Sequence, residues 1–168
     1  MSMNIRNENS LDIDVIDSVT IEAFLNAPHT DHTEQFVVKA LRDSAVLTLS
    51  LVAEVDGIVV GHVAVSPVSI SDQAQGWFGL GPVSVLPQYQ GAGVGSKLIR
   101  QALAELKLLQ AGGCVLLGEP SYYCRFGFKP EARLILAGVP AEYFQAIVLN
   151  GSLPEGEVHY HEAFNAKS

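Results

Sequence analysis

Cysteine is scarce in this sequence, which contains only Cys114 and Cys124. Two cysteines cannot form the framework of several disulfides that stabilises small secreted domains, so that class of protein is excluded. Cys114 opens the apolar run Cys-Val-Leu-Leu, and we interpret it as a small buried hydrophobic residue. No base lies next to Cys124 in the sequence, so we interpret this residue as a reduced thiol and not as a nucleophile.

Long apolar runs and basic clusters are missing too. No continuous apolar stretch is long enough to span a bilayer, and the polar start MSMNIRNENS lacks the apolar segment of a secretory signal. We therefore expect a cytoplasmic protein with no membrane partner. The chain has 10 Lys and Arg against 18 Asp and Glu, a formal net charge of −8. Nucleic-acid binding needs a basic stripe, which is not visible here, so we expect no nucleic-acid partner.

The sequence does contain enough apolar residues for a core, since 48% of its 168 residues are hydrophobic and 17% are charged. A chain of this length and composition can bury a substantial core and suits one domain better than two. We find no internal repeat, low-complexity tract or linker. We therefore predict a single domain spanning residues 1–168, and the oligomeric state stays open between monomer and homodimer.

The first half of the chain predicts two helices and an antiparallel meander. Ser10 has the side chain of a helix N-cap, and apolar residues at helical spacing follow it. Asp56-Gly57 between two apolar runs is a hairpin signal. Gly81-Pro82 interrupts the last strand, which we expect to bulge or lie partly unpaired because proline lacks a backbone donor. The predicted helices are residues 11–25 and 33–42, and the predicted strands are residues 3–6, 47–54, 58–70 and 78–85.

The pattern then changes to a crossover unit. A long helix at residues 91–110, ended by Gly112-Gly113, precedes a buried strand at residues 114–117. Such a crossover makes the strands on either side of the helix parallel. The remaining predicted elements are a short helix at residues 120–125 and two strands at residues 143–148 and 158–161. We expect these two strands to form a final hairpin, which supplies a dimer edge or closes the protein's own sheet.

Three alternating glycines mark the turn before the long helix. Gly91, Gly93 and Gly95 lie where the helix begins. The free N–H groups at the start of a helix point outward and bear partial positive charge. Glycine lets a ligand approach that backbone without a Cβ in the way, so this turn predicts a phosphate site that needs no lysine.

Three phosphate-loop patterns compete for this turn, and two of them fail. A nucleotide-hydrolase loop needs a lysine directly after its last glycine, but Ser96 follows Gly95. A dinucleotide loop needs a glycine three residues after Gly93, and Ser96 stands at that position. The third pattern is Gln/Arg-x-x-Gly-x-Gly/Ala, and Gln90, Gly93 and Gly95 match it at every fixed position.

That third pattern is the acyl-CoA motif of the GNAT superfamily of N-acetyltransferases, which this chain resembles. The order of elements over residues 3–128 is similar to that family, and residues 118–128 resemble a bacterial subgroup of predicted N-acetyltransferases. The resemblance implies an α/β (α+β) fold. Its central sheet would be mixed and mostly antiparallel, with helices on both faces and a splayed central strand pair.

The resemblance also implies a site for acetyl-CoA and no metal. In the family, the pyrophosphate lies on the amides of the loop, here residues 91–96. The pantetheine arm pairs with the strand before the loop, here residues 83–85, and a backbone N–H near Val83 would polarise the thioester carbonyl. The implied cofactor-binding residues are Val83, Ser84, Val85, Gln90, Gly91, Ala92, Gly93, Val94, Gly95 and Ser96.

Two catalytic roles follow from the resemblance. The amine must attack as the free base, so a side chain or a water chain must take its proton. The candidates are Glu22, Glu119 and His62, each of which also suits a purely structural or surface role. Glu119 is preferred because it directly follows the buried strand, where desolvation would raise its pKa. Tyr123, four residues before Gly127, matches the family's general acid, unless it only packs against the cofactor.

We therefore predict an acyl-CoA-dependent N-acyltransferase that moves an acetyl group to a primary amine of a small molecule or peptide. The amine would attack directly in a ternary complex. The alternative is a non-catalytic module that binds or senses acyl-CoA, and a third hypothesis is an interaction protein without cofactor binding, against which the intact loop pattern argues. His159 and His161 alternate along a predicted strand, but two histidines make no metal site without a third ligand.

Overall fold

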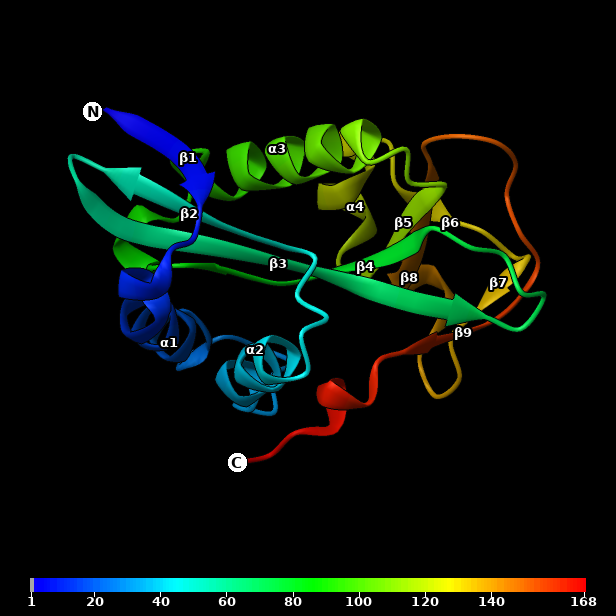
Figure 1. Cartoon of the computed structure of the whole chain (residues 1–168), viewed down its shortest axis with the longest axis horizontal. Coiled ribbons are helices and arrows are strands. Elements are labelled where there is room, and N and C mark those ends of the chain that lie inside the picture. Colours follow the sequence, from blue (N-terminus) through cyan, green and yellow to red (C-terminus); the bar gives the residue numbers. More distant parts are fainter. Residues whose placement is uncertain (1) are drawn as a thin grey trace. The chain divides into compact units, whose positions relative to one another are not determined.

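The structure is a computed structural model that describes residues 2–168 (Figure 1). The chain folds into two compact units, which we describe separately. Among the described residues, the first unit comprises residues 2–65, Gly81–Ala102 and Glu162–Ser168, and the second comprises Ser66–Leu80 and Leu103–His161. Three elements supply residues to both units: β3 (Ile58–Ile70), β4 (Trp77–Val85) and α3 (Val94–Leu108). The single domain stays a prediction.

The first unit is built on antiparallel strands. Its other elements are β1 (Met3–Asn7), α1 (Ile13–Phe24), α2 (Glu34–Asp43) and β2 (Leu49–Val55), with 3₁₀ helices at Ser10–Asp12, Pro87–Tyr89 and Glu162–Asn165. β2 pairs with β1 on one side and with β3 on the other. Asp56 and Gly57 join β2 to β3 with φ angles of 51° and 82°. Two consecutive positive φ angles are typical of a type I′ turn, so the predicted hairpin is confirmed.

Asn9 caps the 3₁₀ helix Ser10–Asp12 that leads directly into α1, and the prediction of Ser10 as the cap is wrong. The Leu11 N–H donates to Asn9 Oδ1 (2.9 Å), and the Asn9 N–H donates to Asp12 Oδ2 (2.7 Å). This reciprocal arrangement is a capping box. Asn9 and not Ser10 is the cap because the acidic residue of the capping box, Asp12, follows Asn9 at the required distance of three residues. Asp12 also accepts hydrogen bonds from Arg6 (2.7 and 2.9 Å), which hold the pKa of its carboxyl below the ordinary value.

Helices cover both faces of the strands in the first unit, as predicted. Helices α1 and α2 lie on one side of β2 and β3, and α3 lies on the other (Figure 1). A hydrophobic cluster joins α1 and α2 to the sheet, and its buried members are Ile16, Val19, Val38, Val52 and Val59. Each helix thus buries an apolar stripe against one face of the sheet, which is the two-layer packing of α/β proteins.

The second unit contains the parallel strand pair that the crossover predicts. Its elements are β5 (Gly113–Leu117), α4 (Pro120–Tyr123), β6 (Lys129–Pro130), β7 (Leu134–Ile135), β8 (Phe144–Val148) and β9 (Gly156–Tyr160), with 3₁₀ helices at Cys124–Phe126 and Ala141–Tyr143. β4 pairs in parallel with β5 from Trp77↔Gly113 to Gly79↔Val115. The pairs with β5 therefore involve only the first part of β4, which itself continues to Val85.

β8 and β9 do not form the predicted final hairpin. β8 pairs antiparallel with β5 and with β6, whereas β9 pairs with the end of β3 and with β7. β6 and β7 are each two residues long, which is too short for an alternating pattern in the sequence. The prediction is wrong because these missed strands, together with β3 and β5, provide the partners of β8 and β9.

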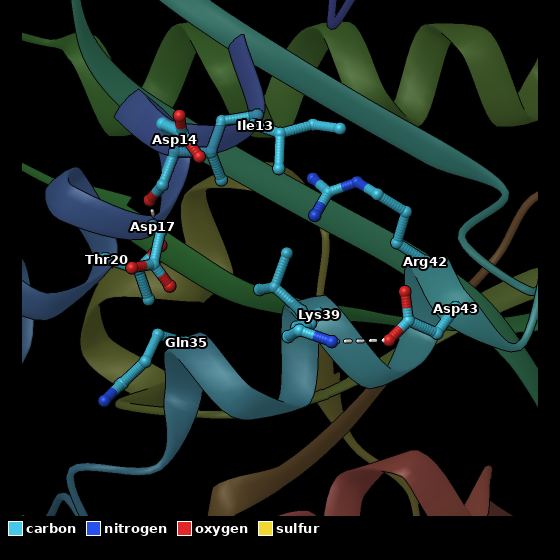
Figure 2. Close-up of a pocket in the computed structure, with 10 residues that line it drawn as sticks. Ile13, Asp14, Asp17, Thr20, Gln35, Lys39, Arg42 and Asp43 are labelled. Carbon is cyan, nitrogen blue, oxygen red and sulfur yellow. Dashed lines mark hydrogen bonds and ion pairs between the residues drawn. The ribbon is translucent and has the colours of Figure 1, made fainter. Parts of the chain in front are cut away.

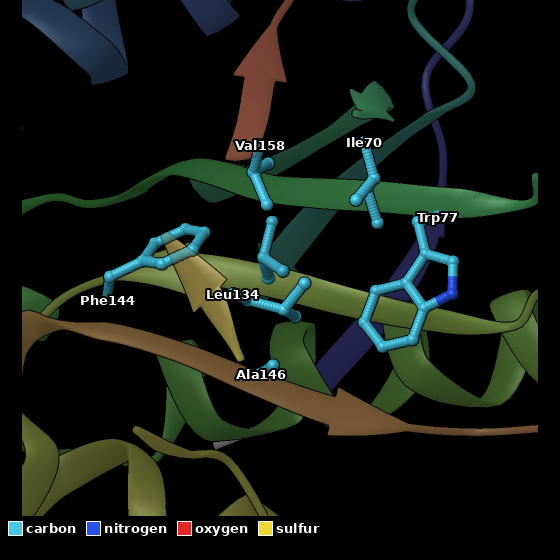
Figure 3. Close-up of a cluster of buried hydrophobic side chains, with 7 residues drawn as sticks. Ile70, Trp77, Leu134, Phe144, Ala146 and Val158 are labelled. Atoms are coloured by element: carbon cyan, nitrogen blue, oxygen red, sulfur yellow. The ribbon is translucent and has the colours of Figure 1, made fainter. Parts of the chain in front are cut away.

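Trp77 belongs to the core of the second unit and lies at one side of its buried cluster (Figure 3). The buried members of this cluster are Ile70, Trp77, Val115, Leu134, Phe144, Ala146 and Val158. A Cβ at Gly113 would lie 2.6 Å from Trp77 Cζ2 and 2.5 Å from the Ile147 carbonyl oxygen, and a Cβ at Gly112 would lie 2.9 Å from Trp77 Nε1. These two glycines therefore make room for the indole.

The prediction that Gly112-Gly113 end the long helix is wrong. Helix α3 ends at Leu108, and Gln110 takes the left-handed conformation (φ 60°) just beyond it. A non-glycine residue in this conformation is uncommon but tolerated in turns. The two glycines lie instead at the start of β5. Glycine is needed there because a side chain would collide with Trp77, and not because the backbone takes a left-handed conformation.

Replacing Gly113 with alanine tests this packing. We expect Gly113→Ala to destabilise the protein by about 3 kcal/mol, because neither the indole nor a backbone oxygen can move aside cheaply in a close-packed core. The measurement is urea unfolding followed by circular dichroism. Ser121→Ala, at an exposed position of the same unit, is the control and should leave the unfolding free energy within about 0.5 kcal/mol. Equal stability of both variants would contradict the packing argument.

Candidate active site

The glycine loop lies between the end of β4 and the start of α3. The 3₁₀ helix Pro87–Tyr89 follows β4, and α3 begins at Val94, three residues later than predicted. Gly91 and Gly93 have φ angles of 80° and 85°, a conformation that favours glycine. Within the described chain, a Cβ at either glycine would meet no atom within 4 Å. The loop glycines thus serve the backbone conformation and leave the space beside them open.

Hydrogen bonds within the first unit fix this loop. The Gln90 side chain donates from Nε2 to the Val85 carbonyl (3.0 Å), which ties the loop to the end of β4. The Lys97 N–H donates to the Gly93 carbonyl (3.1 Å), which makes the first turn of α3 continuous with the loop. The structure therefore gives Gln90 a local role, namely holding the loop, in addition to any contact with a ligand.

Gly61 on β3 sets the position of α3 beside the strands. A Cβ there would lie 2.9 Å from Val94 Cγ1, 3.1 Å from Leu98 Cδ1 and 3.2 Å from the Ser84 carbonyl oxygen. Without a side chain at Gly61, the helix start and β4 can both approach β3 closely. Gly61 is not among the predicted site residues, although a lone glycine inside a predicted strand is the recognised sign of such an approach.

The exposed start of α3 suits an anion. Gly91, Ala92 and Gly93 are exposed, whereas Val94 is buried. The first N–H groups of a helix lack intrahelical partners and bear partial positive charge, so this segment can bind a phosphate through backbone amides. In the strand before it, Ser84 is buried and its Oγ makes no hydrogen bond with the described residues.

The second unit places Tyr123 and Glu119 in one short turn. The Tyr123 N–H donates to the Glu119 carbonyl (3.1 Å). The phenol of Tyr123 is half-buried, and this burial, with a smaller effect of Tyr122, raises its pKa to about 12. Tyr123 is therefore protonated at neutral pH and can donate a hydrogen bond. Glu119 is exposed, so the expectation that its position after a buried strand desolvates it is wrong, because the burial of β5 already ends at Leu117, whose side chain is exposed.

His62 lies deep in the first unit and is fully buried. Its Nε2 is 2.8 Å from Ser50 Oγ, and Ser50 also bonds to Glu8. Arg42 donates two hydrogen bonds to the same carboxylate (2.8 and 3.1 Å). Burial would raise the pKa of Glu8, but the bonds from Arg42 and Ser50 outweigh it and bring that pKa below its usual value.

This network determines the tautomer of His62. Since ionised Glu8 can only accept, the Ser50 hydroxyl donates to it and accepts from a protonated His62 Nε2. Nδ1 is then unprotonated, and it makes no hydrogen bond with the described residues. Burial lowers the pKa of His62 to about 4, so the imidazole is neutral at physiological pH. The structure favours a structural role for His62 over the role of a base.

A family model and a curated relative both match this chain. The model for the acetyltransferase (GNAT) domain matches residues 47–130. The uncharacterized N-acetyltransferase YhbS of Escherichia coli K12 is 35% identical over 159 residues, which cover 89% of this chain and 94% of YhbS. The chain belongs to the GNAT acetyltransferase family. The predicted family membership is thereby confirmed.

Solved GNAT structures show the same fold. A GNAT acetyltransferase from Brucella melitensis in complex with acetyl-CoA has a TM-score of 0.86 and 48% identity, covering 97% of this chain and 98% of its own. YhbS from E. coli in complex with CoA has a TM-score of 0.88 and 34% identity, covering 99% of this chain and 93% of its own. The predicted mixed, mostly antiparallel fold is confirmed.

A pocket of about 320 Å³ lies between α1 and α2 of this GNAT chain (Figure 2). Its lining residues are Ile13, Asp14, Ile16, Asp17, Thr20, Gln35, Val38, Lys39, Arg42 and Asp43. Lys39 pairs with Asp43 (2.8 Å) along α2, and Asp14 and Asp17 come from α1. The lining thus combines three carboxylates with two cationic side chains. No sequence pattern indicated the pocket, because two separate helices form it.

Two structural features are absent from residues 2–168. No group of three His, Cys, Asp or Glu side chains there is arranged to hold a metal ion. No helix in that range is long and apolar enough to cross a membrane.

The buried neutral state of His62 predicts how stability depends on pH. The pKa of His62 is about 4 in the folded protein against 6.5 for the ordinary side chain, so the unfolded state binds the extra proton as pH falls below 6.5. We expect the unfolding free energy to decrease by about 2 kcal/mol between pH 7.5 and pH 5 from this residue. Urea unfolding at both pH values measures it.

The comparison uses His62→Gln, whose amide N–H can still donate to Ser50, and His159→Gln at an exposed position as the control. The His62→Gln variant should lose most of the pH dependence, whereas the control should keep it. An unchanged slope in His62→Gln would contradict the neutral, buried state.

Proposed function

We propose that this protein is an acetyl-CoA-dependent N-acetyltransferase that acts on a primary amine of a small molecule or peptide. The observation that supports it best is the glycine loop, which presents backbone to open space at the start of α3. A protein of 48% identity that covers nearly the whole chain was crystallised with acetyl-CoA. A loop suited to phosphate within such a chain favours acetyl-CoA as the acyl donor.

Residues of the first unit would hold the donor. In this proposal, the backbone N–H groups of residues 91–96 bind the pyrophosphate, and the backbone of residues 83–85 pairs with the pantetheine arm. Three features support this fit: the left-handed glycines, the exposure of residues 91–93 and the Gln90 bond that holds the loop. The binding uses helix amides and no metal ligand.

Transfer needs one bond to form and one to break. The amine nitrogen attacks the thioester carbonyl carbon, the C–S bond breaks, and the proton of the amine passes to a base or to water. We propose Tyr123 as the hydrogen-bond donor to the departing sulfur, because its pKa of about 12 keeps the phenol protonated. A thiol titrates near ~8.5, so the thiolate can leave without complete proton transfer. Glu119, exposed in the same turn, is the proposed base.

The proposal also covers the compartment, the oligomeric state and the partners of the enzyme. We infer a cytoplasmic enzyme, a monomer or homodimer, that has no nucleic-acid partner. The net charge of −8 would draw a cationic amine toward the surface by electrostatic steering.

Calorimetric titration with acetyl-CoA tests the loop. We expect a micromolar Kd for the unmodified protein and loss of binding in Gly93→Val, because the new side chain fills the space beside the loop amides. Gly57→Val is the matched control, since Gly57 has nearly the same φ (82° against 85°) and equally open surroundings but lies in the β2–β3 hairpin. It therefore bears the same backbone strain and should bind normally.

Absence of binding by the folded, unmodified protein would contradict the proposed function. Equal loss in both variants would show that strain, and not access to the loop, removes binding. Normal binding without acetylation of any amine in a panel of primary amines would favour the non-catalytic acyl-CoA module.

Replacing Tyr123 tests the proton donor. We expect Tyr123→Phe to lower kcat about 100-fold, the lower part of the range for general-acid catalysis, with little change in KM for acetyl-CoA. Tyr122→Phe is the control and should keep activity within about threefold, because it removes the neighbouring hydroxyl only. In the unmodified enzyme, kcat should show no decrease with rising pH up to about pH 10, since Tyr123 stays protonated there. Full activity of Tyr123→Phe would overturn its role.

A further inference from the structure

Gln145 is a fully buried amide in the middle of the second unit. It stands on β8 opposite Leu116 of β5 on one side and Pro130 of β6 on the other. Burying an amide costs stability unless its polar atoms find partners. Its Oε1 makes no hydrogen bond with the described residues, so the burial of this oxygen costs free energy that an apolar group in its place would not cost. The polar end of Gln145 therefore needs an explanation beyond stability.

The amide of Gln145 holds the residue that follows β5. Its Nε2 donates to the Gly118 carbonyl (2.9 Å). A carbonyl only accepts, so the orientation of the amide follows from this partner. The Gly118 N–H donates to the Tyr143 carbonyl (3.0 Å), which lies just before β8. Both polar groups of Gly118 are thus bound by neighbouring residues of the β8 segment.

Gly118 in turn forms the surface on which the Tyr123 ring rests. A Cβ at Gly118 would lie 2.8 Å from Tyr123 Cδ2 and 3.3 Å from Cζ, and closer still to Cε2. Three ring atoms near one position mean that the ring lies directly against the Gly118 backbone. Only glycine gives the ring this space, so the location of the Gly118 peptide sets the location of the ring.

Aromatic neighbours hold the ring from other directions. The ring centroid of Tyr123 is 5.0 Å from that of Tyr122 and 6.3 Å from that of Phe128, both in edge-to-face geometry. Phe128 is almost completely buried and gives a rigid wall. With these walls in place, a shift of the Gly118 peptide would tilt the ring and displace the hydroxyl at its far end.

We propose that Gln145 is a positioning residue, which acts through the Gly118 peptide to set the place of the Tyr123 hydroxyl for acyl transfer. The proposal rests on the proposed function, because it assigns a purpose to the position of Tyr123. A misplacement of about 1 Å in a catalytic group can reduce the rate by up to about 100-fold. One buried amide, far from Tyr123 in the sequence, would thus control the rate without contacting substrate.

The first experiment observes the ring itself. The protein is labelled with 3-fluorotyrosine, and the Tyr123 signal among its five tyrosines is identified by its loss in Tyr123→Phe. Gln145→Met keeps the length of the side chain and removes the N–H donor, so the Tyr123 fluorine signal should shift by more than its linewidth. Gln75→Met, at an exposed position of the same unit, should leave it in place. An unshifted signal in Gln145→Met would overturn the proposal.

A second variant guards against misfolding. Gly118→Ala places a methyl group against the ring and should shift the same signal by direct contact. Circular dichroism shows whether each variant is folded. The Gly118→Ala shift shows that the signal reports the contact with this peptide. If Gln145→Met does not fold, Gln145→Leu, which also lacks the N–H donor, takes its place, and an unshifted Tyr123 signal in folded Gln145→Leu would overturn the proposal.

The second experiment is a kinetic double-mutant cycle with an amine that the protein acetylates. We expect Gln145→Met to lower kcat about tenfold and to leave KM for acetyl-CoA unchanged. In the Tyr123→Phe background the same change should cost less than about twofold, because the group to be positioned is gone. A tenfold loss in both backgrounds would mean a purely structural role and overturn the proposal. Full activity of Tyr123→Phe alone would refute the proposed catalysis instead, and the fluorine spectra would still decide whether Gln145 positions the ring.

Discussion

Close approach of backbone and side chain at glycine is the constraint on which both units depend. At Gly61, the start of α3 and the Ser84 carbonyl come so near to β3 that any Cβ would collide with them. At Gly113, the indole of Trp77 occupies the place of a side chain, and at Gly118 the ring of Tyr123 does so. A close-packed interior cannot accommodate an added methyl group at such points. These three glycines therefore determine the positions of α3, of the Trp77 indole and of the Tyr123 ring.

The loop glycines are needed for backbone conformation and not for close packing. Gly91 and Gly93 have left-handed backbone conformations, and a Cβ at either would point into open space. At the packed glycines, other protein atoms occupy the space of the missing side chain. At Gly91 and Gly93, no atom of the described chain occupies it. Glycine at an exposed helix start therefore keeps backbone amides accessible to an approaching anion, which is the physical link between the loop and the function that we propose.

Buried polar groups show a similar contrast between the two units. His62 lies in a network in which its Nε2 bonds to Ser50 and Ser50 in turn bonds to Glu8, and burial keeps the imidazole neutral. Such a network fits a structural role in the first unit. The Gln145 side chain donates from Nε2 to the Gly118 carbonyl, and the Tyr123 ring rests against the Gly118 peptide. One polar group thus stabilises an interior, and the other controls the place of a residue that we assign to the reaction.

Local signals were enough to predict the Asp56-Gly57 hairpin, the bounds of β3, the parallel crossover and the family of the loop from Gln90 to Gly95. Each depends on backbone conformation or periodicity within a few neighbouring residues. The sequence could not show that Asn9 and not Ser10 caps the turn that leads into α1, that β8 and β9 pair with other strands and not with each other, or that Glu119 is exposed. It gave no sign of the contact between Gly118 and Tyr123 or of the bond from Gln145. Only the tertiary structure decided these features, because burial and strand partners depend on contacts between residues far apart along the chain.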